Sequence, residues 1–137
     1  MRNLMNGLGL AVAMLAPSAA LAQPDAALAG ALAQEDRPIK AMLRQATDVC
    51  QDAMASVSRT ALDECNRRLQ VAQQMVRGDA VRAEVKKLHD AEFSVALAWM
   101  MSMQDAIDKS KAAIPVYVRF SEALDAADRP AKPKKKQ

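Results

Sequence analysis

Residues 50–65 read CQDAMASVSRTALDEC, a segment that begins and ends with the only two cysteines of the 137-residue chain. In one continuous helix these cysteines would lie about 22 Å apart, whereas the Cα atoms of a disulfide are separated by roughly 5.5 Å. The midpoint of the pair falls within residues 56–60, SVSRT, and Thr60 with Asp63 three residues later resembles a capping box. We therefore predict a helical hairpin that turns near residue 57 and is linked by a disulfide between Cys50 and Cys65.

The apolar residues on both sides of this turn recur in steps of three and four, the pattern of an amphipathic helix. The first helix is predicted to begin near Pro38, and Arg77-Gly78 is predicted to end the second. The first stripe consists of Ile39, Met42, Leu43, Ala46, Val49, Cys50, Ala53, Met54 and Val57. The second stripe consists of Leu62, Cys65, Leu69, Ala72, Met75 and Val76.

A third stripe follows Asp79, which we expect to cap a helix. It consists of Val81, Val85, Leu88, Val95, Trp99, Met103, Ala106, Ser110 and Ile114. Only Ala91 or Glu92 bridges the interval between Leu88 and Val95. Because no Gly or Pro interrupts the stripe, we expect one continuous helix of about 34 residues, with a kink near residues 89–94 as the alternative.

Pro115 lacks a backbone donor and clashes with the preceding turn, so we expect it to kink or end the long helix. Tyr117, Phe120 and Leu124 continue at helical spacing in a short further segment. The composition agrees with helices, because Ala, Leu, Met and charged residues are abundant while the aromatic fraction is only 3%. The predicted fold is all-α: a small helical bundle in which a disulfide-linked hairpin packs against the long helix.

Residues 1–22 have the pattern of an export signal peptide. Arg2 precedes an apolar run over residues 4–16, and Ala20-Leu21-Ala22 matches a signal peptidase site. We therefore expect a periplasmic or secreted protein that is not transmembrane after cleavage. Such an oxidising compartment also favours pairing of the two cysteines.

The remaining chain divides into three parts. We expect a flexible or weakly helical leader over residues 23–37, a single α-helical domain over 38–128 and a disordered basic tail over 129–137. The tail contains Lys132, Lys134, Lys135 and Lys136, whereas residues 23–128 contain 13 basic and 16 acidic side chains. We expect either contact between the tail and an anionic surface or a merely solubilising extension, and we expect no nucleic-acid partner.

Residues 93–103, FSVALAWMMSM, are apolar on all sides except for Ser94 and Ser102. A helix that is apolar all round must be enclosed, and the rest of the chain offers little to enclose this one. The segment is therefore either core or an interface with another protein or a second copy, as in a homo-oligomer. The candidate interaction surface consists of Phe93, Leu97, Trp99, Met100, Met101 and Met103.

The alternative is a periplasmic copper-type metal-binding or metal-sensing protein, because methionine thioethers are ligands for Cu(I). His89 would have to contribute, although it lies about 15 Å along the helix from Trp99. The sequence contains no other histidine and no Cys-x-x-Cys motif. We therefore assign no catalytic residue, metal ligand or cofactor, and we do not expect an enzyme.

Overall fold

The computed structural model describes residues 25–129 of the chain. This part of the chain folds into helices and contains no strand, which confirms the all-α class. The helices are α2 (Ala26–Ala33), α3 (Arg37–Ser56), α4 (Arg59–Met75), α5 (Asp79–Met101) and α6 (Met103–Asp128). The predicted signal peptide and the four tail lysines lie outside the described residues.

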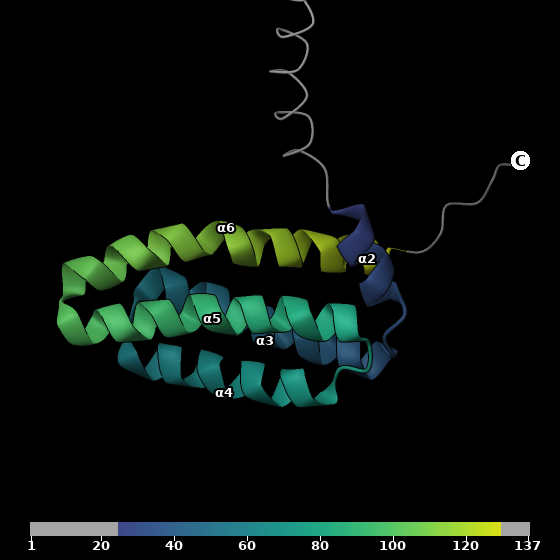
Figure 1. Ribbon diagram of the computed structural model, residues 1–137, viewed down its shortest axis with the longest axis horizontal. Coiled ribbons are helices and arrows are strands. Elements are labelled where there is room, and N and C mark those ends of the chain that lie inside the picture. Colours follow the sequence, from purple (N-terminus) through teal and green to yellow (C-terminus); the bar gives the residue numbers. More distant parts are fainter. Residues whose placement is uncertain (1–24, 130–137) are drawn as a thin grey trace, which may run out of the picture.

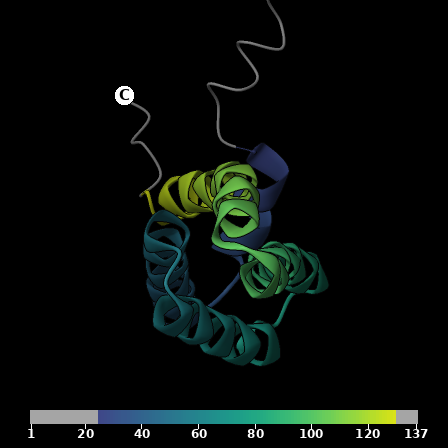
Figure 2. The same ribbon diagram turned by 90° about the vertical axis from the view of Figure 1, so that its left-hand side faces the viewer.

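Helices α3 to α6 run alternately up and down and form a four-helix bundle (Figure 1). Each helix packs against the next one in the chain, and α6 returns to contact α3, which closes the ring (Figure 2). The α3–α4 and α5–α6 connections lie at one end, which we call the turn end. Helix α2 packs against α6 and α5 at the opposite end, which we call the α2 end.

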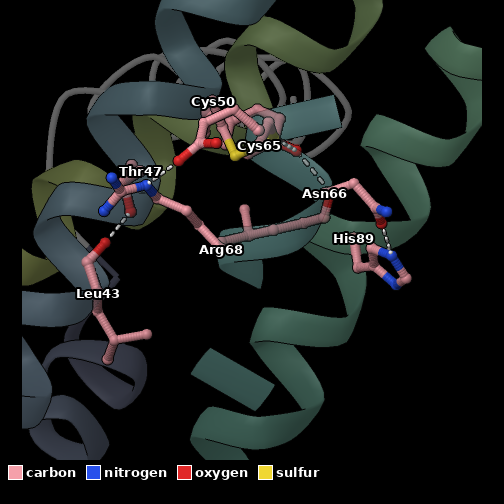
Figure 3. The surroundings of a disulfide bond; sticks show 10 residues. Leu43, Thr47, Cys50, Cys65, Asn66, Arg68 and His89 are labelled. Atoms are coloured by element: carbon pink, nitrogen blue, oxygen red, sulfur yellow. Dashed lines mark hydrogen bonds and ion pairs between the residues drawn. A yellow bond between two sulfur atoms is a disulfide. The ribbon is translucent and has the colours of Figure 1, made fainter. Parts of the chain in front are cut away.

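The predicted hairpin and its disulfide are both present. Cys50 of α3 and Cys65 of α4 are bonded, with their Cα atoms 4.7 Å apart, and both side chains are fully buried (Figure 3). Val57 makes the turn with a left-handed φ of 51°, which is rare for a β-branched residue. Ser58, and not Thr60, caps α4, because its hydroxyl accepts a hydrogen bond from the Ala61 N–H at 3.1 Å.

The buried tyrosine of α6 connects the disulfide to the other two helices. The hydroxyl of Tyr117 donates a hydrogen bond to the carbonyl of Leu88 on α5 at 2.6 Å, and it lies 3.9 Å from the Sγ of Cys65. Burial raises the pKa of Tyr117, and the Glu92 carboxylate adds to that increase, so the hydroxyl remains a donor. All four helices of the bundle therefore meet near the disulfide.

The expectation of one continuous helix through residues 81–114 is wrong. Helix α5 ends at Met101, and Ser102 takes an extended conformation before α6 returns antiparallel to α5. The Ser102 hydroxyl accepts the N–H of Asp105 at 3.0 Å, so serine serves as the cap of the new helix. A reversal needs neither Gly nor Pro here, because φ at Ser102 is −165°, an ordinary extended value.

Of the two outcomes expected at Pro115, a kink or the end of a helix, the end is wrong. Pro115 lies inside α6, which continues to Asp128. The ring projects from an exposed position, and Lys111, whose carbonyl loses its partner, is exposed to water as well. Buried residues on both sides, including Ala113 and Tyr117, hold the two halves of the helix against the bundle.

The leader forms part of the folded body in the described residues. Leu28 and Leu32 of α2 are buried in the common core. After the end of α2 in the chain, the carboxylate of Glu35 accepts hydrogen bonds from the backbone N–H groups of Arg77 and Gly78, at 3.0 and 2.8 Å. Gly78, and not Asp79, is the N-cap of α5, and its φ of −81° is not left-handed.

Gly78 permits a close approach that a larger residue would disturb. A Cβ at this position would lie 3.2 Å from the Glu35 carboxylate oxygen. Glu35 therefore supplies the acceptor that the start of α5 needs, and it does so from the α2–α3 connection. This contact joins two loops that are far apart in sequence.

We predict that Cys50→Ala, Cys65→Ala and the double variant all lower the melting temperature by similar amounts, because each removes the same bond. The closed loop of 15 residues corresponds to about 3 kcal/mol on the chain-entropy scale. Thermal unfolding followed by circular dichroism, with and without reductant, measures the effect. Two reactive thiols in the untreated folded protein would contradict the disulfide.

Candidate interaction surface

Five large apolar side chains near the turn end are exposed, and we call this set the methionine-rich patch. Its members and exposed fractions are Phe93 55%, Leu97 50%, Met100 72%, Met101 78% and Met103 51%. All but Met103 lie on α5, at spacings of three and four that place them along one side of the helix. The structure therefore places these five predicted residues at the surface and not in the core.

A shallow groove with a volume of about 690 Å³ lies beside the patch, between the end of α5 and the start of α6. Helix α5 contributes Ser94, Leu97, Ala98, Met100 and Met101, and α6 contributes Asp105, Asp108 and Lys109. One wall is therefore almost entirely apolar, whereas the other is charged. The groove exists because Ser102 reverses the chain and sets the two helices side by side.

Trp99 belongs to the structural framework and not to the exposed patch. Its ring is half-buried, and its Nε1–H donates to the carbonyl of Val57 at 3.0 Å. The Arg59 guanidinium lies over the ring, 5.4 Å from the centroid, and also pairs with Asp63 at 3.7 Å. Trp99 thus ties the end of α5 to the α3–α4 turn, which fixes the position of the patch relative to the bundle.

The opposite end of the bundle is held by charged groups. Arg119 of α6 pairs with Asp25 beside α2 at 2.7 Å and with Glu84 of α5 at 2.8 Å. The hydrogen bond from Arg119 is the main cause that lowers the pKa of Glu84. Arg44 of α3 likewise pairs with Asp125 of α6 at 2.8 Å. The leader therefore covers the α2 end and leaves the methionine-rich patch uncovered.

His89 has a structural partner on another helix. Its Nε2 is hydrogen-bonded to the Oδ1 of Asn66 on α4 (Figure 3). The histidine is half-buried there and does not join the methionine-rich patch. Among the described residues, no group of three His, Cys, Asp or Glu side chains is arranged to hold a metal ion.

Glu92, like Glu35, is a buried carboxylate that the sequence did not lead us to expect. It is only 3% exposed, on the inner face of α5 between Leu88 and Val95. Burial raises its pKa to about 7, and the charge of Asp63 on α4 adds to the increase. A sequence signal for this burial does exist, because Glu92 lies at helical spacing between the core residues Leu88 and Val95.

Comparison of the chain with protein-family models, with curated proteins and with solved structures gives no match. Within residues 25–129, no helix combines the length and hydropathy needed to cross a bilayer. Among the large apolar side chains of the described residues, Met100 and Met101 of the methionine-rich patch are the most exposed.

We predict that Glu92 makes the folded protein less stable as the pH rises. Its pKa near 7 in the folded state lies above the ordinary value of 4.5, so folding takes up a proton between these pH values. The stabilising effect of that proton, of the order of a few kcal/mol, is lost as the pH rises through 7. Melting temperatures from pH 5.5 to 8 should therefore decrease.

Glu92→Gln should reduce this slope and raise the melting temperature at pH 8, because the buried charge is removed. Glu122→Gln is the matched control, since Glu122 is exposed on α6. If both variants follow the wild-type pH dependence equally, the raised pKa of Glu92 is contradicted.

Proposed function

We propose that this is an exported, non-enzymatic helical-bundle protein that acts by binding another protein, or a second copy of itself, through the methionine-rich patch. The observation that carries the proposal is the exposure of Met100 and Met101, at 72% and 78%, beside Leu97 on a helix whose other side is buried. Exposed apolar surface of this kind, rimmed by polar residues, is typical of interaction sites.

The five residues of the methionine-rich patch do not belong to the buried core. The core is already filled by the inner faces of α2 to α6, and the largest buried side chains include Tyr117, Phe120 and Met54. Trp99 and Ser102 hold the patch in a fixed place without covering it. Because the methionine-rich patch is held in a fixed place and yet is exposed, binding of a partner is the role that it supports best.

Export remains a proposal that rests on residues 1–22. The pattern of a basic start, an apolar run and Ala20-Leu21-Ala22 supports it. The disulfide between Cys50 and Cys65 is consistent with an oxidising compartment, because such bonds are rare in reducing ones.

We predict that the Leu97→Asp, Met101→Asp double variant loses association while keeping its fold. Both side chains are exposed, so the free energy of unfolding should change by no more than about 1 kcal/mol. Sedimentation velocity over a range of concentrations tests self-association, and affinity capture from a periplasmic extract tests binding of another protein.

Val71→Asp is the matched control, because Val71 is an exposed apolar residue of α4 outside the patch. The control should associate as the wild type does. The proposal fails if the wild-type protein is monomeric at all concentrations and captures the same proteins as the double variant.

A further inference from the structure

We infer that the groove beside the methionine-rich patch binds an amphipathic helix of another polypeptide, one that carries Lys or Arg next to its apolar face. The inference rests on the proposed function and names the chemistry of the partner. Two features of the groove support it: its shape and the charges on its rim.

The shape suits a helix. Two antiparallel helices form the walls, with Leu97, Ala98 and Met101 of α5 on one side and the start of α6 on the other. A third helix can lie along such a groove and bury its apolar side at spacings of three and four. The small side chain of Ala98 at the floor, only 7% exposed, lets the incoming helix approach closely.

The charges on the rim select a cationic partner. Residues 93–104 contain no charged side chain, and the first charges beyond them are Asp105 and Asp108 of α6, on the groove wall. Asp108 accepts a hydrogen bond from Gln104 at 3.0 Å, and neither carboxylate pairs with a cation within residues 25–129. Lys109 offsets only one of these two charges, so the rim remains acidic.

The rim charges also favour a helix of another polypeptide over a second copy. A two-fold contact centred on the groove would bring Asp105 and Asp108 of both copies together, which like-charge repulsion opposes.

The methionines of the patch allow the groove to bind partner helices with different apolar side chains. Met100 and Met101 have long, unbranched and polarisable side chains that repack against different surfaces. The groove therefore sets the shape and charge of its partner more strictly than the identity of the partner's apolar residues.

The test uses three fluorescent peptides of about 16 residues, a length that allows helix formation on binding. One is an amphipathic helix of Leu and Lys, the second has Glu in place of each Lys, and the third is a scrambled Leu/Lys sequence with no apolar face. Fluorescence anisotropy with the purified full chain measures each dissociation constant at low salt.

We expect the Leu/Lys peptide to bind at least about tenfold more tightly than the Leu/Glu peptide, and the scrambled peptide not to bind. Residues 23–128 contain 16 acidic and 13 basic side chains, so general attraction would also favour the Leu/Lys peptide, and variants of the rim carboxylates are needed to separate the two effects. The Asp105→Asn, Asp108→Asn variant should bind the Leu/Lys and Leu/Glu peptides equally.

The matched control is Asp48→Asn with Asp52→Asn, two exposed carboxylates of α3 that are not part of the groove, and it should keep the preference. Equal binding of the Leu/Lys and Leu/Glu peptides by the wild type overturns the inference but leaves the proposed function in place. Failure of every peptide, together with self-association that Leu97→Asp abolishes, overturns it in favour of a second copy. Peptide binding that the Leu97→Asp, Met101→Asp variant retains contradicts the proposed function itself.

Discussion

The disulfide between Cys50 and Cys65 holds α3 against α4 at the level where Tyr117 enters the core from α6. Because the Tyr117 hydroxyl also bonds to the Leu88 carbonyl of α5, one covalent link and one buried hydroxyl connect all four helices of the bundle. A core with so few aromatic side chains gains much from such a cross-link, since the net stability of a small domain is only about 5–15 kcal/mol.

The two ends differ in the forces that complete them. At the α2 end, Arg119, Glu84 and Asp25 form a charged cluster, and Glu35 supplies acceptors for the start of α5. At the turn end, Trp99 anchors α5 to the Val57 carbonyl, and the methionine-rich patch projects beyond that anchor. The fold is therefore closed by polar contacts at one end and presents apolar surface at the other, which is why recognition is the role that we propose.

The hairpin could be predicted from the sequence because cysteine spacing and turn-forming residues pointed to the same position. The reversal at Ser102 could not be predicted, because the apolar residues before and after it continue at helical spacing. Whether the chain reverses there depends on the tertiary packing of α6 against α5. The sequence does not decide whether residues 93–103 are exposed, because a run that is apolar all round does not reveal which side is covered. Glu35 shows the same limit, because its partners at Arg77 and Gly78 are set by the fold.

The exposure of the methionine-rich patch is the central claim, and solvent access to the methionine methyl groups tests it most directly. In the isolated protein with 13C-labelled methionine methyls, a soluble paramagnetic agent should strongly broaden the signals of Met100 and Met101. Met54, which is only 2% exposed in the core, provides the internal reference and should remain sharp. Equal protection of all three methyl groups in a monomer would show that the chain itself covers the patch, and it would contradict a free recognition surface.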